Sequence, residues 1–151
     1  MYKSARASNN VFASYISKVA QEIGLTRALE LLSSTYENIG NYRGGNYKNQ
    51  SETRKFNAEN AFPIIKKVVE ELGMDYEIMH MDPKKVVIKL GKCPLFESAK
   101  FGGLNPKNFC HCGALKYMNG LLENLNPKLE YEINEIKAVE EDFCITTLKL
   151  K

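Results

Sequence analysis

Four cysteines are the residues of this chain whose side chains offer the most distinctive chemistry. Cys93 lies in the run LGKCPLFE, Cys110 and Cys112 flank His111 in the run NFCHCG, and Cys144 opens the apolar run CITTLKL. Thiolates suit a tetrahedral zinc ion or an iron–sulfur cluster. The chain lacks the paired CxxC knuckles of a zinc ribbon, so a metal site would require the fold to bring these positions together.

The close spacing of Cys110 and Cys112 sets a geometric condition on such a site. On a continuous helix, residues two positions apart point about 200° away from each other. Either the helix proper begins after Gly113, or only one of the two thiols faces a shared ion, with His111 as the substitute ligand. Free cysteines are most often small buried hydrophobic residues, and that alternative stays open for all four positions. Cysteine catalysis has little support, because no Cys/His/Asn or Ser/His/Asp pattern accompanies the thiols.

Length and composition indicate one domain with a buried core. The chain has 151 residues, 44% of them hydrophobic, and a formal net charge of +3. So small a charge does not favour a nucleic-acid partner. No apolar run is long enough to span a membrane, and the start MYKSARASNN does not read as a signal peptide. We expect a cytoplasmic protein with reduced cysteines, folded as a single domain over residues 1–151, with a helical segment over residues 1–73 and a metal-binding and sheet segment over residues 74–151.

Helical periodicity dominates the first half of the chain. Apolar residues recur at helical spacing between Asn10 and Gly24 and between Thr26 and Gly40, which predicts two helices. A third helix is predicted over 58–72, with Pro63 in its first firm turn. The segment 41–55 between them is polar, contains two glycines and has no period. We expect it to form an exposed, mobile loop lying over a pocket.

The second half of the chain changes to the period of two that is typical of strands. The runs DYEIMHM and KKVVIKL predict one hairpin, and LEYEINEIKAV with FCITTLKL predicts another. A helix over 106–125 separates the hairpins, and Pro94 with the following glycines favours irregular chain after Cys93. The predicted fold is therefore α+β: three N-terminal helices, a hairpin, a helix and a hairpin, giving a four-stranded antiparallel sheet with helices on one face. Strand ends and a helix start meet at one end of this sheet, where the four thiols are expected to converge.

The runs KCPLFE, FCHCGALKYMNGLLENLNP and EDFCITTL together resemble the 4-vinyl reductase domain superfamily. They are also similar to the family of L-2-amino-thiazoline-4-carboxylic acid hydrolase. The resemblance covers about residues 55–151. It implies an α+β domain, often dimeric, that shares its fold with subunits of the TRAPP vesicle-tethering complex. Some members of the superfamily are sensory modules in which a cysteine-bound zinc ion sits beside a pocket for a small hydrophobic molecule.

Carried over by residue, the resemblance matches Cys93 to the family's first cysteine and Cys144 to its last. The middle cysteine of the family would fall near 133–136, where this chain has none, so Cys110 and Cys112 would supply the remaining ligands. The resemblance thus implies a module that is stabilised by a metal and forms a homodimer. It further implies that the module binds a small hydrophobic ligand and acts as a sensor or carrier. The alternatives are a metal-dependent hydrolase with one open coordination position and an iron–sulfur redox sensor.

Overall fold

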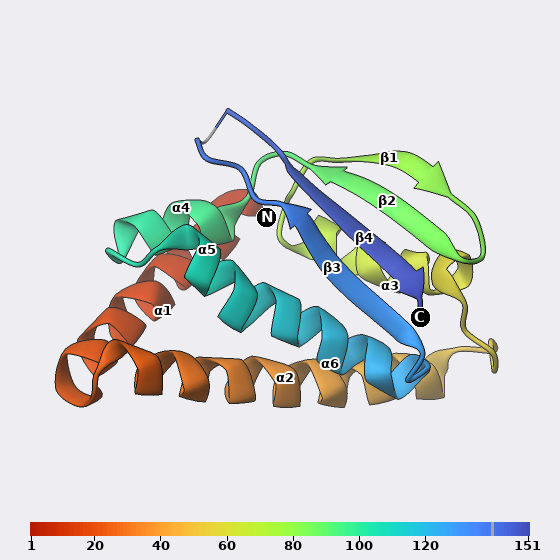
Figure 1. The fold of residues 1–151 in the computed structure, drawn as a ribbon, viewed down its shortest axis with the longest axis horizontal. Helices are drawn as coiled ribbons and strands as arrows, with labels where there is room; N and C mark the ends of the chain where they lie inside the picture. The colour runs from red at the N-terminus through yellow and green to blue at the C-terminus, as the bar shows by residue number, and fades with distance from the viewer. Residues whose placement is uncertain (140) are drawn as a thin grey trace.

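The computed structural model describes residues 1–139 and 141–151. Three helices come first, and two β-hairpins separated by further helices follow (Figure 1). The N-terminal helices are α1 (Tyr2–Ile23), α2 (Leu25–Gln50) and α3 (Ala58–Glu71). The hairpin β1 (Tyr76–Met81) and β2 (Lys85–Leu90) follows. A run of helices comes next: α4 (Pro94–Phe101), α5 (Pro106–Phe109), the π-helical turn η1 (Cys110–Ala114) and α6 (Leu115–Leu125). The last hairpin is β3 (Leu129–Glu135) and β4 (Cys144–Leu150).

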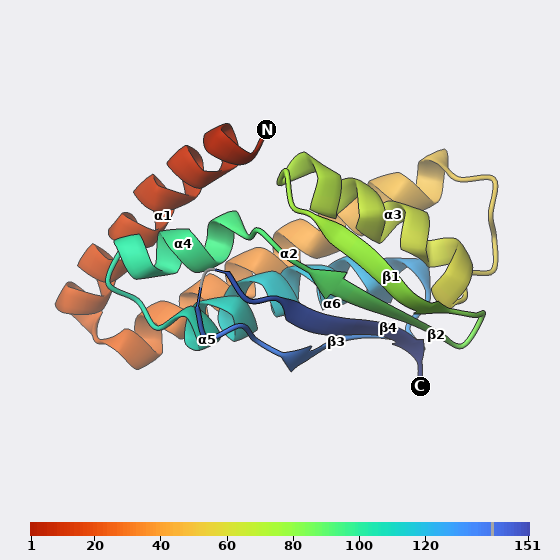
Figure 2. The same ribbon diagram turned by 90° about the horizontal axis from the view of Figure 1, so that it is seen from above.

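The four strands form one antiparallel sheet in the order β1-β2-β4-β3. Helices α3 and α6 cover one face of this sheet, and α2 lies beyond α6 (Figure 2). Alternation along β2 explains which face they cover, because Val86, Ile88 and Leu90 are buried among the helices while the residues between them face outward. The predicted α+β fold with a four-stranded antiparallel sheet is confirmed.

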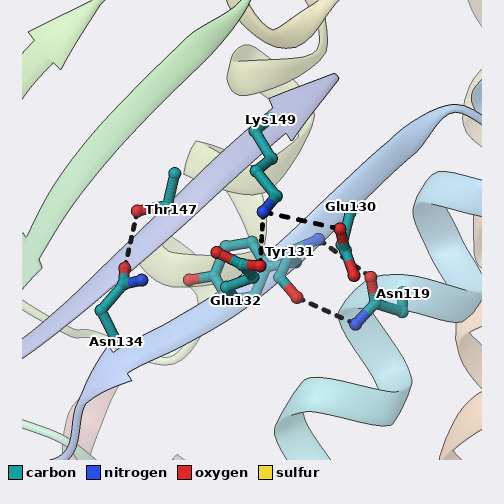
Figure 3. A network of polar contacts seen from close by, with 7 residues as sticks. All are labelled: Asn119, Glu130, Tyr131, Glu132, Asn134, Thr147 and Lys149. Carbon is teal, nitrogen blue, oxygen red and sulfur yellow. Dashed lines mark hydrogen bonds and ion pairs between the residues drawn. The ribbon is translucent and has the colours of Figure 1, made fainter. Parts of the chain in front are cut away.

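Polar side chains of β3 and β4 contact one another on the uncovered face of the sheet, as Figure 3 shows. Lys149 on β4 forms ion pairs with Glu130 and Glu132 on β3, at 3.8 and 2.5 Å. Asn119 on α6 fixes the edge strand β3 from the other side. Its amide donates to the carbonyl of Tyr131 at 3.0 Å, and its side-chain oxygen accepts from the Tyr131 N–H at 2.9 Å (Figure 3). Helix α6 is thereby held against β3 by hydrogen bonds as well as by apolar packing.

The predicted mobile loop over 41–55 is wrong, because α2 continues to Gln50 and only a short connection precedes α3. Gly40 and Gly44 do not break this helix; they allow its backbone to lie directly against α6. A Cβ atom at Gly40 would collide with the carbonyl oxygen of Tyr117, and one at Gly44 with that of Leu121. Gly120 is needed on the α6 side, because its Cβ would collide with the carbonyl oxygen of Glu37.

Two other local predictions are also wrong. The chain after Cys93 is helical rather than irregular, since Pro94 stands at the first position of α4, where its missing N–H costs nothing. The third helix lies close to its predicted range of 58–72, but Pro63 stands in its second turn and not in its first. The helix begins at a capping box, in which Asn57 and Asn60 exchange side-chain to backbone hydrogen bonds of 2.9 and 2.7 Å.

Candidate functional site

Three of the four cysteines line one apolar cavity of about 70 Å³ between the helices and the sheet. Cys93 is the N-cap residue of α4, Cys110 begins η1, and Cys144 begins β4. The cavity lies where the two core clusters meet, with Leu90 and Met118 among its walls. Thiols that are far apart in the sequence therefore share one enclosed space.

The sheet register explains how Cys93 and Cys144 come together. Cys144 is the cross-strand partner of Leu90, the last residue of β2, and Cys93 follows Leu90 after a short connection. Cys110 reaches the same end of the sheet from the helical layer, because η1 leads directly into α6, which packs on β3. Strand pairing and helix packing thus both direct a thiol to the cavity.

Cys112 lies elsewhere. The α-helix α6 begins at Leu115, after Gly113 as one alternative required, but the preceding turn η1 is itself helical, of the π type. Of the two thiols, Cys110 lines the cavity, whereas Cys112 is half-buried against a second core cluster that includes Leu32 and Phe109. His111, the predicted substitute ligand, is exposed. The predicted four-thiol set is therefore only partly brought together.

Two of the cavity thiols, Cys93 and Cys110, are held in their protonated form. Burial raises the pKa of Cys110 to about 12, and the neighbouring Cys93 and Cys144 add to the increase. Burial likewise raises the pKa of Cys93, although the backbone N–H groups of Phe96 and Leu95 partly oppose it. Because the thiolate is the metal ligand and the nucleophile, these groups would have to lose a proton before either kind of chemistry.

Lys137 is a buried charged residue beside the cavity thiols that sequence reasoning missed. This lysine is only 3% exposed, and its ammonium group lies 3.4 Å from the carbonyl oxygen of Gly91 and 4.8 Å from the ring centroid of Phe96. Its backbone N–H donates to the sulfur of Cys144 at 3.4 Å. The positive charge of Lys137 works against the raised pKa values of Cys93 and Cys110. Nothing in the sequence near this turn distinguishes a buried lysine from a solvated one.

The described geometry gives no support for a bound metal. Within residues 1–139 and 141–151, no group of three or more histidine, cysteine, aspartate or glutamate side chains is arranged to hold a metal ion. Sharing a cavity is thus not the same as converging on one point. The zinc site at Cys93, Cys110, Cys112 and Cys144 and the iron–sulfur alternative stay predictions.

A second cavity, of about 220 Å³, adjoins the first. The two share four apolar wall residues, which are Leu72, Leu95, Ala114 and Met118. Charged side chains, Arg43 and Glu71, line the outer cavity together with Tyr117, whereas the inner cavity has no arginine, lysine or carboxylate among its described lining residues. The two cavities are therefore neighbours separated by an apolar wall, the outer one lined in part by charged side chains and the inner one by the three thiols.

The polar groups of the outer cavity form a connected cluster between α2, α3 and α6. Nη2 of Arg43 donates to the hydroxyl of Tyr47 at 3.1 Å and to the carboxylate of Glu71 at 3.2 Å. Burial raises the pKa of Tyr117, and the nearby Arg43 opposes the increase. Burial also raises the pKa of Tyr36, to about 12. Arg43 was hidden from sequence reasoning because the segment that carries it was interpreted as a loop.

Comparison with known proteins shows the fold but no family. No family model matches the chain, and no curated protein matches it. Among solved structures, the phenol-responsive sensory domain of the transcription activator PoxR, solved with phenol, is similar with a TM-score of 0.65. That match has 11% identity and covers 94% of this chain and 74% of the other.

None of the described helices combines the length and hydrophobicity that a membrane span needs.

A trafficking protein particle complex subunit 3 from Naegleria fowleri, covalently bound to palmitic acid, is also similar. Its TM-score is 0.52 at 15% identity, and the match covers 96% of each chain. The molecule is thus an α+β protein of the fold shared by these two neighbours, as the sequence resemblance implied. Membership of the 4-vinyl reductase superfamily stays a prediction.

Proposed function

We propose that this protein binds a small hydrophobic molecule in the paired cavities and acts as a sensor or carrier module. The observation that carries the proposal is the adjoining pair of cavities, whose shared walls are apolar. Ligand sites are concave and mostly apolar, with a few polar groups that orient the ligand. The outer cavity, with Arg43 and Tyr117 beside Leu72 and Met118, has this character.

The cavity volumes limit the size of the ligand. An engineered apolar cavity of roughly 150 Å³ accepts benzene. By that measure the outer cavity, at about 220 Å³, has room for one aromatic ring with a substituent. The inner cavity, at about 70 Å³, takes less than a ring unless its walls move. A single-ring compound or a short aliphatic chain is therefore the ligand size that we propose.

The two structural neighbours support a hydrophobic ligand. One was solved with phenol and the other with palmitic acid. Both identities are low, so they support the kind of site and not the identity of the ligand.

An occlusion variant tests the proposal. Ala114 lines both cavities, and Ala114→Leu places a larger side chain in their shared wall while keeping a good helix former. Ala7→Leu makes the same exchange at an exposed position of α1 and serves as the matched control. Calorimetric titration with single-ring compounds, phenol among them, should show binding to the wild type and Ala7→Leu and a loss of at least tenfold in Ala114→Leu. Equal binding by all three proteins would contradict the proposal.

We further propose that the module works as a homodimer in the cytoplasm. Exposed apolar side chains on α1 and α2, including Val11, Tyr15 and Tyr42, support self-association. Sedimentation equilibrium measures the association directly, and a monomer at high micromolar concentration would contradict it.

Metal binding is a separate proposal, supported by the donor set and not by the described arrangement. Cys93, Cys110 and Cys144 would be the ligands, and zinc is the metal that we propose for them, since thiolate ligands suit it. Elemental analysis of purified protein tests this, with Cys93→Ser and Cys144→Ser expected to lose the metal and Cys112→Ser to retain it. A colourless protein without metal would leave the thiols as cavity walls. A brown one absorbing near about 400 nm would favour an iron–sulfur cluster.

A further inference from the structure

We infer that the ligand of the outer cavity is an organic acid, whose carboxylate is bound by Arg43 while its apolar body extends toward Leu72, Ala114 and Met118. The inference rests on the proposed function and adds the chemical class of the ligand. It also makes Arg43 the residue that determines specificity.

The position of Arg43 is the first observation. Its guanidinium lines the outer cavity, and contacts to Tyr47 on its own helix and to Glu71 on α3 hold it there. The ring of Tyr47 lies under the guanidinium, with 5.7 Å between the guanidinium carbon and the ring centroid. The contact with Tyr47 orders the guanidinium, so a ligand that takes the place of Glu71 would not have to order it.

The donor geometry of Arg43 favours a carboxylate. A guanidinium carries five donor hydrogens in a planar fork, which matches the two oxygens of a carboxylate. The hydrogen bonds to Tyr47 and Glu71 are both made by Nη2, so they use only some of this capacity. Charge-assisted bonds of this type are stronger than those to a neutral hydroxyl or amide.

The local charge balance points the same way. Lys67 lies 5.8 Å from the ring centroid of Tyr47, so two cations, Arg43 and Lys67, lie near the same ring. Glu71 is the carboxylate that faces Arg43 across the cavity lining. The cluster Arg43, Lys67 and Glu71 therefore has a net positive charge, which favours an anionic ligand over a cationic one.

The Arg43–Glu71 ion pair does not block this site. Both side chains are partly exposed, 38% and 51%, and exposed pairs contribute only about 0–1 kcal/mol. A ligand carboxylate therefore displaces Glu71 from Arg43, or shares Arg43 with it, at little cost. The apolar lining begins next to the pair along the chain, since Leu72 follows Glu71 and lines both cavities.

Benzoate and benzamide are the probes for the test, because they have nearly the same shape and differ in charge. Benzoate should bind the wild type about tenfold more tightly than benzamide in low-salt calorimetric titrations. Arg43→Gln should remove this difference, and Arg43→Lys should restore only some of it. Arg27→Gln is the matched control, since Arg27 lies on the same helix and also pairs with a glutamate, Glu30, but far from the cavities.

Glu71→Gln supplies a result that misfolding cannot produce. Removing the competing carboxylate should tighten benzoate binding several-fold and leave benzamide unchanged. Equal binding of the two probes, or a benzoate preference that survives Arg43→Gln, would overturn the inference and leave the proposed function intact. Failure of benzoate, benzamide and phenol alike to bind would overturn both.

Discussion

Two adjacent glycines of α2 provide a sharp test of how the helical layer is packed. Gly44 faces α6, and a Cβ atom there would lie 3.0 Å from Cβ of Asn124 and collide with the Leu121 carbonyl oxygen. At Gly45 a Cβ atom would make only ordinary van der Waals contact, 3.9 Å from the side-chain nitrogen of Asn124. The same exchange to alanine at neighbouring positions should therefore have opposite effects on stability.

The magnitudes follow from two opposing contributions. Glycine to alanine inside a helix gains about 1 kcal/mol of helix propensity at either position. At Gly44 the added methyl also meets backbone atoms that no rotamer change can move, so the overpacking cost reaches about 3 kcal/mol. Gly45→Ala should thus stabilise the protein by about 1 kcal/mol, and Gly44→Ala should destabilise it by about 2 kcal/mol.

Urea unfolding followed by circular dichroism at about 222 nm measures both free energies of unfolding, with the slope m as the check on two-state behaviour. In a thermal scan, the two variants should differ in Tm by about 6–12 °C for a chain of this size. Gly40→Ala and Gly120→Ala should behave like Gly44→Ala, because each collides with a carbonyl oxygen across the same interface. If Gly44→Ala proves as stable as Gly45→Ala, the close contact between α2 and α6 is wrong.

Three other measurements address the thiols and a helix cap. Because the pKa of Cys110 is about 12 in the native state and 9.0 ordinarily, the unfolded chain loses this proton first as pH rises. Stability should fall between pH 9 and 12 by up to about 1.4 kcal/mol per pH unit, and Cys110→Ser should reduce the fall seen in urea unfolding. Iodoacetamide followed by mass spectrometry should modify the half-buried Cys112 and Cys144 before the buried Cys93 and Cys110. Asn57→Ala should cost about 1 kcal/mol in the same unfolding assay, whereas Asn57→Asp should retain most of the cap.

Periodicity predicted the elements whose apolar residues face a single partner. The strand β2 alternates strictly, and α3 has one apolar face, so both lie close to where the sequence placed them. The second half of α2 was missed because it packs through glycines against the backbone of α6, so no repeating apolar side chains mark it in the sequence. Gly40 and Gly44 look like helix breakers in the sequence, yet they are the residues that allow α6 to approach.

The convergence of the thiols was predictable from strand order, and their detailed roles were not. Pairing β2 with β4 places Cys93 near Cys144, which two hairpins separated by a helix already imply. Which of Cys110 and Cys112 faces the cavity depends on the phase of a continuous helix through a π-helical turn, and periodicity does not reveal such a turn. Arg43 and Lys137 have no local signal, since their neighbours in space come from other elements.

The two proposed occupants of this site need not compete for the same space. A metal bound by Cys93, Cys110 and Cys144 would take the inner cavity, where Cys93 and Cys110 would first have to lose protons that burial now retains. An organic acid bound at Arg43 would take the outer cavity, beyond the wall formed by Leu95 and Met118. Benzoate titrations with and without added zinc therefore separate the two. Equal affinities would mean independent cavities, and a change in affinity would mean that the shared wall transmits occupancy from one cavity to the other, as a sensor requires.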